Sequence, residues 1–179
     1  RRRRRGAHQM CKSGRAIAAL RHLGVGEDAA KGALTNTFWP ARRQKLKAGP
    51  LLDAAPGAGL WLDGGHNPAA GAAVAETLAR LPTRPTHMIC GMLSTKDVAG
   101  YLAPLAKTAV ALHAVAIPGE SATLPADVTR DAALGVGLSA SVAASVEDAL
   151  AAIVKQDPTA RVLICGSLYL AGVILRENG

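Results

Sequence analysis

The residues best suited to chemistry stand in LWLDGGHNPAAG, residues 60–71, where an apolar run ends at Asp63 and His66 follows two glycines. A carboxylate can accept hydrogen bonds from a ribose or orient a basic partner, and a neutral imidazole can donate to a phosphate or a carboxylate. The order predicts a buried strand, a tight turn and a helix start, and such turns bind ligands in open α/β sheets. The alternative is a plain connection in which Asp63 satisfies backbone donors of its own turn.

A second candidate turn follows RVLICG, residues 161–166. The hydroxyl of Ser167 and the free amides of a helix start suit a carboxylate, although the serine can equally be a simple N-cap. The sequence contains no G-x-x-x-x-G-K-[ST] phosphate loop, no G-x-G-x-x-G after a strand and no G-x-S-x-G nucleophile elbow. The residues alone therefore predict an α/β domain with two candidate sites at the edge of a sheet.

Apolar periodicity predicts the elements that must position these residues. Two short helices come first, one ending at Gly24 and one over 27–36, and a strand begins near Gln44. Residues 51–59 are predicted to form a loop or hairpin connection. The remaining strands are predicted at 60–63, 86–93, 111–117, 138–143 and 161–166, and the helices at 68–81, 97–109, about 125–134, 145–156 and 167–178. Such alternation implies a mostly parallel sheet covered by helices.

Composition limits the class of protein. The 179 residues are 49% hydrophobic and 19% charged, as expected of a globular chain, and only 3% are aromatic. The net charge of +8 includes the five arginines of the run Arg1–Arg5, so it does not by itself imply nucleic acid. Cys90 and Cys165 each end an apolar run and are predicted to be buried free thiols. With three dispersed cysteines, no long apolar span and no signal peptide of the usual form, we expect a cytoplasmic protein.

Four motifs in a fixed order, FWPARRQ, LWLDGGHNPAAG, GMLSTKD and ICGSLYLAG, carry a resemblance. Together they closely resemble the folylpolyglutamate synthase/dihydrofolate synthase family, a branch of the Mur ligases. The resemblance runs from residue 8 to 179 but corresponds only to the final part of the family's protein. It implies a helical, Arg-rich remnant of the central ATPase domain over 1–37. It implies the C-terminal domain, a Rossmann-like, mostly parallel sheet flanked by helices, over 38–179.

The resemblance also implies a reaction. ATP phosphorylates a carboxylate of dihydropteroate or of a folate such as tetrahydrofolate, and the amine of L-glutamate attacks the acyl phosphate. Charge on the phosphates calls for an arginine and for Mg²⁺. In the family the phosphate loop and the Mg²⁺ ligands lie on the central domain, so no metal ligand and no catalytic residue is expected here. We therefore expect this chain alone to be inactive.

Site residues follow position by position from the resemblance. Arg42, in WPAR, matches the arginine that contacts the ATP phosphates, and the W-P-x-R spacing selects it over Arg43. Asp63 and His66 match positions near the nucleotide, and His66 is also assigned to glutamate. Ser167, in GSLY, matches the serine that helps bind the incoming glutamate.

Two lysines are further candidates for the cleft. Lys12 stands where the family's HQ-x-x-NA motif has an asparagine near the ATP phosphates, and it could reach a phosphate as a point charge. Lys96 matches the family's K-D pair, in which Asp97 is expected to cap a helix. Tyr169, beside Ser167, is expected to pack.

Two other functions remain open from the sequence. A truncated domain with an arginine tail could be a non-catalytic module that binds anions or nucleic acid, although scarce aromatic residues disfavour specific single-strand binding. The chain could also come from another Mur-type branch, but the motif set favours folate substrates. The resemblance implies small-molecule partners, no specific nucleic acid, no membrane and a monomer.

Overall fold

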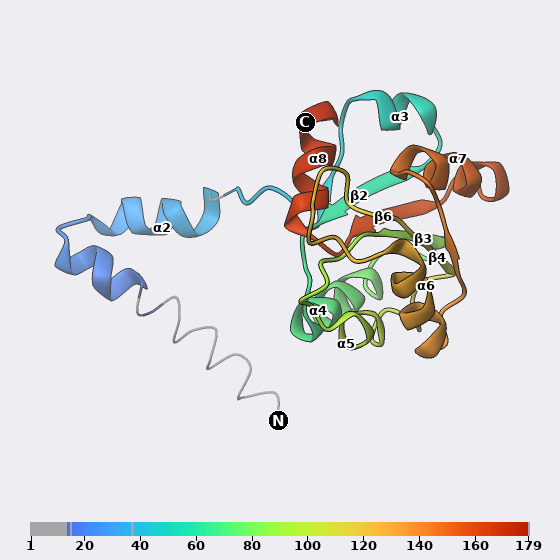
Figure 1. Cartoon of the computed structure of the whole chain (residues 1–179). Helices are drawn as coiled ribbons and strands as arrows, with labels where there is room; N and C mark the ends of the chain where they lie inside the picture. Colours follow the sequence, from blue (N-terminus) through green and yellow to red (C-terminus); the bar gives the residue numbers. More distant parts are fainter. Residues whose placement is uncertain (1–13, 15, 37, 179) are drawn as a thin grey trace. The chain divides into compact units, whose positions relative to one another are not determined.

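The computed structural model describes residues 14, 16–36 and 38–178, and its contacts divide the chain into two compact units, Arg1–Trp39 and Pro40–Gly179. In the first unit residues 16–22 are helical, Gly24 turns the chain with φ of 76°, and α2 spans Glu27–Asn36 (Figure 1). Both helices were predicted. Lys12 and the arginine run lie outside the described residues. Among the described residues, no helix has the length and apolar character needed to cross a membrane.

The second unit is built on a six-stranded sheet in the order β1-β2-β6-β3-β4-β5. Only β1 runs antiparallel to its neighbour, β2; the other pairs are parallel. The strands are β1 Gln44–Lys45, β2 Gly59–Asp63, β3 Thr86–Cys90, β4 Ala111–Ala114, β5 Ala140–Val142 and β6 Arg161–Cys165. The predicted strand positions and the mostly parallel sheet are confirmed.

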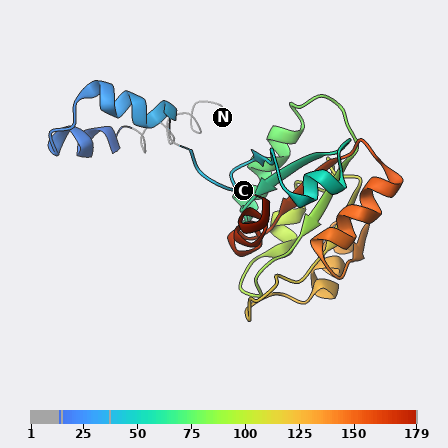
Figure 2. The same ribbon diagram turned by 90° about the horizontal axis from the view of Figure 1, so that it is seen from above.

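Helices cover both faces of this sheet (Figure 1). One layer contains α3 Pro50–Ala54, α7 Val146–Gln156 and α8 Leu168–Asn178, which lie in front of the strands when the molecule is seen from above (Figure 2). The other contains α4 Pro68–Leu78, α5 Val98–Leu102 and α6 Ala126–Gly135. Every residue of β3 and β6 is buried, as expected for central parallel strands covered on both sides.

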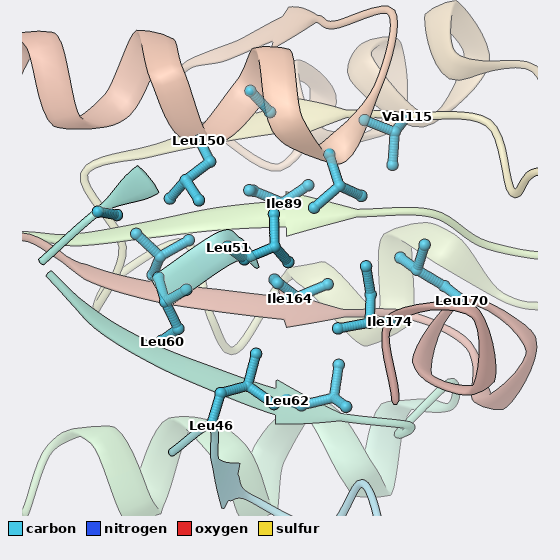
Figure 3. Packing of buried hydrophobic residues seen from close by; sticks show 14 of the residues in the cluster. Leu46, Leu51, Leu60, Leu62, Ile89, Val115, Leu150, Ile164, Leu170 and Ile174 are labelled. Carbon is cyan, nitrogen blue, oxygen red and sulfur yellow. The ribbon is translucent and has the colours of Figure 1, made fainter. Parts of the chain in front are cut away.

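The core beneath α7 and α8 is built from aliphatic side chains that meet between the layers (Figure 3). Leu60, Leu62 and Ile164 project from β2 and β6 toward Leu150 and Ile174 of the helices. Each of these residues is no more than 1% exposed, and burying such a side chain contributes about 1.5–3 kcal/mol. This packing fixes β2 and β6, the two strands whose ends carry the predicted site.

Several predicted boundaries were wrong. The strands predicted at 86–93 and 111–117 end at Cys90 and Ala114. Residues 51–59, expected as a connection, contain α3, because Asn178 of α8 accepts the amide of Leu51 at 2.9 Å and supplies a cap from a distant part of the chain. Helix α5 ends at Leu102 instead of 109. Ala103 still has helical geometry, but the proline at 104 has no amide to donate the next hydrogen bond of the helix. Helix α4 ends at Leu78 instead of 81.

Candidate functional site

The two predicted edge sites lie side by side. In the register of β2 and β6, Asp63 is paired with Cys165, so the turn after each strand begins at the same level of the sheet. A Cβ added at Gly64 would lie 2.3 Å from the Cδ2 atom of Leu168, which shows how closely the first turn approaches α8. Gly166 has φ of 103°, and a Cβ there would lie 2.7 Å from the carbonyl oxygen of Gly91. Glycine is therefore required at position 166, whereas at position 64 the exposed side chain of Leu168 could turn aside.

Asp63 is 4% exposed, and both of its oxygens are engaged by backbone amides. Oδ1 accepts a hydrogen bond from Gly65 at 2.7 Å, and Oδ2 accepts one from Arg43 at 3.0 Å. The bond to Gly65 is the local turn that the sequence allowed as an alternative. The bond to Arg43 was not predicted, because no local pattern connects residues 20 positions apart. In this structure Asp63 organises the backbone of two segments.

The segment that carries Arg42 has an unusual backbone conformation. Ala41 and Arg43 both have positive φ, 54° and 50°, a region that costs most non-glycine residues about 1–3 kcal/mol. Hydrogen bonds hold it: the amide of Gly64 donates to the carbonyl of Ala41 at 2.8 Å, and the amide of Ala41 donates to Oε1 of Gln44 at 2.9 Å. Together with Asp63, these bonds fix the segment at the carboxyl edge of β2.

The two neighbouring arginines differ in their side-chain contacts. Nη1 of Arg43 donates to the hydroxyl of Thr77 in α4 at 2.9 Å. Arg42 is exposed, and within the described part of the chain its guanidinium has neither a hydrogen-bond partner nor an ion-pair partner. Of the two, Arg42 is therefore the arginine without a side-chain partner among the described residues. Its contact with the ATP phosphates, chosen from the W-P-x-R spacing, stays a prediction.

His66 is partly buried, and its Nδ1 lies 3.1 Å from the carbonyl oxygen of Gly64. Because a carbonyl can only accept, Nδ1 carries the proton in this contact, and the neutral ring then presents Nε2 as an acceptor. Donation from Nε2 of a neutral ring, as expected from the sequence, needs the other tautomer and stays a prediction. Asn67 caps α4 as predicted, with its side chain accepting from the amide of Ala70 at 2.9 Å.

Ser167 is 2% exposed, and its Oγ accepts a hydrogen bond from the amide of Tyr169 at 3.0 Å. The hydroxyl thus caps α8 and keeps its own proton for donation. Tyr169 was expected to pack, but it is 58% exposed, because it lies on the outer side of the first turn of α8. It borders a cavity of about 400 Å³ that Glu120 and Arg176 also line. No local pattern in the sequence predicted this cavity.

Lys96 is partly buried on the turn after β3, the strand beside β6. No hydrogen bond or ion pair joins its ammonium group to another of the described residues, and the structure does not bring it into contact with Arg42, His66 or Ser167. Asp97 caps α5 by accepting the amide of Gly100 at 2.8 Å, as predicted.

Buried titratable groups lie under these turns. Cys90 and Cys165 are free and buried, as predicted, and they are paired across β3 and β6. Their hydrogen bond, followed by burial, raises the pKa of the Cys90 thiol. Burial, followed by the charges of the neighbouring cysteines, raises the pKa of Tyr101. With raised pKa values Cys90 and Tyr101 stay neutral at pH 7, so they support the turns by packing.

Comparison with known proteins identifies the family of the domain that carries this edge. A model described as "Mur ligase, glutamate ligase domain" matches residues 51–168. The chain belongs to the Mur ligase family. Its glutamate ligase domain includes Asp63, His66, Lys96 and Ser167 within the matched range, whereas Arg42 precedes it.

Curated relatives of this glutamate ligase domain are longer proteins. A probable bifunctional folylpolyglutamate synthase/dihydropteroate synthase of Halobacterium salinarum is 33% identical over 168 residues, which are 92% of this chain and 19% of that protein. The folylpolyglutamate synthase of Lacticaseibacillus casei is 30% identical over 141 residues, 79% of this chain and 30% of that protein. The chain therefore spans less than a third of either relative.

Solved structures share the fold of this Mur ligase domain. FolC of E. coli in complex with DHPP and ADP superposes with a TM-score of 0.70 at 24% identity, covering 92% of this chain and 37% of that one. A bifunctional folylpolyglutamate synthase/dihydrofolate synthase with Mn, AMPPNP and L-glutamate bound gives a TM-score of 0.66 at 25% identity, covering 84% of this chain and 34% of that one. The Rossmann-like fold predicted from the sequence is thus confirmed.

Proposed function

We propose that this chain is the C-terminal part of an ATP-dependent ligase that joins L-glutamate to dihydropteroate or to folates. The observation that carries the proposal is the register of β2 and β6, which sets the turn of His66 beside the turn of Ser167. The names of the relatives support the substrate class, and one solved structure of the same fold holds a nucleotide analogue and L-glutamate.

The proposed reaction has two bond exchanges. A carboxylate oxygen of the folate attacks the γ-phosphorus of ATP, and ADP leaves with the electrons of the broken P–O bond. The amine nitrogen of glutamate then attacks the acyl carbon. The tetrahedral intermediate expels phosphate and the nitrogen loses a proton, which leaves an amide. The first step needs neutralised phosphate charge, and the second needs an amine oriented toward the acyl carbon.

The chain's own groups fit these needs. Arg42 has a free guanidinium for the ATP phosphates. Ser167 has a hydroxyl proton to donate to a carboxylate of glutamate, next to the first amides of α8. The Nε2 atom of His66, an acceptor in the neutral ring, suits the glutamate amine better than a phosphate. Asp63 acts as a positioning residue, because it holds the segment that carries Arg42. This role accounts for a carboxylate at the family's position near the nucleotide without a direct contact to the nucleotide.

The side chains of these residues do not form a site for Mg²⁺. Both oxygens of Asp63 are occupied by amides, and the described residues contain no cluster of three or more His, Cys, Asp or Glu side chains that could hold a metal ion. We therefore assign the Mg²⁺ ligands and the phosphate loop to a central domain of the complete enzyme, whose end we assign to residues 1–37 of this chain.

The test compares the product of the complete reading frame with the isolated 179-residue chain. Each is incubated with Mg-ATP, L-glutamate and either dihydropteroate or tetrahydrofolate, and ADP and the glutamylated product are followed by mass spectrometry. We expect product only from the complete enzyme, and the acceptor used distinguishes the two folate activities. A complete enzyme that binds ATP but glutamylates neither acceptor would overturn the proposal. Product from the isolated chain would overturn the need for the central domain.

A further inference from the structure

Two arginines without acidic partners meet at the amino edge of the sheet, opposite the site described above. Arg161 is the first residue of β6, and Arg84 precedes β3. Four residues of β6 follow Arg161 before the carboxyl edge, a span of roughly 13 Å. Any ligand held by this pair would therefore lie apart from the turns of His66 and Ser167.

Neutral oxygens hold both guanidinium groups in place. Arg161 is 7% exposed; its Nη1 donates to the hydroxyl of Thr86 at 3.2 Å and its Nη2 to the carbonyl of Pro82 at 2.8 Å. Arg84 donates from Nε to the carbonyl of Thr159 and from Nη2 to that of Gly57 at 2.7 Å. A guanidinium has five N–H donors, so each arginine retains donors beyond these bonds.

Two carboxylates of neighbouring segments are paired with other groups. Asp157 lies 2.6 Å from Nε2 of His87, whose side chain belongs to the opposite face of the sheet. Glu76 of α4 pairs with Arg80 at 2.6 Å. Among the ion pairs of residues 14, 16–36 and 38–178, none includes Arg84 or Arg161. A buried cation without a carboxylate is costly, so this pair is an uncommon feature.

A cavity of about 200 Å³ opens beside both arginines. Thr83 and Thr108 also line it, together with the last residues of α4. Burial, and then the charge of Arg84, lower the pKa of Arg161 from its ordinary value. The end of α4 offers partial negative charge, which stabilises the cations but does not neutralise them.

We propose that Arg84 and Arg161 form a second anion site of this protein, one that takes a phosphate-type oxyanion at the amino edge of the sheet. Planar guanidinium groups bind phosphate through paired N–H donors, and two of them beside one cavity match a doubly charged ion. The plain alternative is that both side chains only tie the loops before β3 and β6 together. The two readings differ in whether an added anion binds here.

The test is an NMR titration of the 179-residue chain with inorganic phosphate, with ionic strength held constant by sodium chloride. We expect saturable shifts in the amides of residues 82–86 and 161, together with a rise in melting temperature, because a ligand that binds only the folded state stabilises it. Methyl phosphate, titrated in parallel, distinguishes the source. Binding as tight as that of phosphate indicates a phosphoester group as the natural ligand, and weaker binding indicates the free ion; both support the site.

Variants separate this site from general attraction to a basic protein. Arg84→Gln should weaken phosphate binding at least tenfold. Arg80→Gln, which removes a nearby arginine already paired with Glu76, should leave it unchanged, as should Arg130→Gln, which removes an arginine paired with Asp131. Arg84 is preferred to the buried Arg161 because its loss is less of a threat to folding. Equal phosphate binding by all four proteins, or shifts confined to residues 41–44 and 166–169, would overturn the proposal.

Discussion

Asp63 accepts the backbone amide of Arg43 at 3.0 Å and so ties the end of β2 to the segment that presents Arg42. The same carboxylate holds Gly65 at 2.7 Å. Arg42 lies between two residues with positive φ, a conformation that needs such external bonds to persist. The backbone position of Arg42 is therefore set by a carboxylate of the neighbouring turn.

Replacing Asp63 with asparagine should destabilise the second unit. One of its two oxygens becomes an NH₂ group facing an amide N–H, so one buried donor loses its acceptor at a cost of about 1–3 kcal/mol. Urea unfolding followed by circular dichroism measures the change. Asp53→Asn, which alters an exposed carboxylate in the first turn of α3, should change the free energy of unfolding by less than about 0.5 kcal/mol. Equal effects of the two variants would show that the hydrogen bonds of Asp63 to the amides of Arg43 and Gly65 do not stabilise the unit.

The two arginines of the segment should differ in function. In the complete enzyme, Arg42→Gln should cost about 1.5–3 kcal/mol of transition-state stabilisation, at least a tenfold loss in kcat/KM for ATP, because a charged hydrogen bond to phosphate is lost. Arg43→Gln removes a guanidinium that bonds Thr77 and should retain most activity. Steady-state kinetics at saturating glutamate decide this, and the reverse ranking would make Arg43 the phosphate ligand.

Two serine caps allow binding to be separated from stability. Ser167→Ala and Ser145→Ala each remove an N-cap hydroxyl, of α8 and α7, and each should cost about 1 kcal/mol of stability. Only Ser167→Ala should also raise the KM for glutamate in the complete enzyme. If both variants change KM equally, Ser167 is a cap and nothing more.

Glycine at position 71 is predicted to be essential for the contact between α4 and α5. A Cβ there would lie 2.1 Å from the carbonyl oxygen of Tyr101, a backbone atom that cannot turn aside. Gly71→Ala should therefore destabilise the unit by about 1–3 kcal/mol or more. Gly172→Ala, in α8 with no atom within 4 Å of the added Cβ, should stabilise it by about 0.5–1 kcal/mol. Thermal melts of the two variants should shift in opposite directions.

The free energy of unfolding should decrease in mild acid because of His113. Burial, and then the ring of His87, lower the pKa of His113 from 6.5, so between the folded-state pKa and 6.5 the unfolded chain binds more protons. The free energy of unfolding should therefore decrease as pH falls through that window. In urea unfolding, His113→Asn should flatten this dependence, and His22→Asn in the first unit should leave it intact. An unchanged slope in His113→Asn would assign the effect to another group.

The sequence by itself determined the alternation of elements and the position of each strand-to-helix turn. Periodic apolar residues bury one stripe of each helix, and Asn67 and Pro68 define a helix start through interactions within a few residues. These signals are local, so they can be read without the fold. The four motifs added the family resemblance, which the match to the glutamate ligase domain confirmed.

Only the tertiary structure decided which of these groups meet. The register of β2 with β6 sets Asp63 opposite Cys165, and the contacts of Asp63 with Arg43 and of Leu51 with Asn178 join positions far apart in the chain. The same packing leaves Arg84 and Arg161 together without a carboxylate. Such contacts arise because the folded chain must satisfy every buried polar group with whatever donor or acceptor packing brings near, and no local pattern specifies that partner.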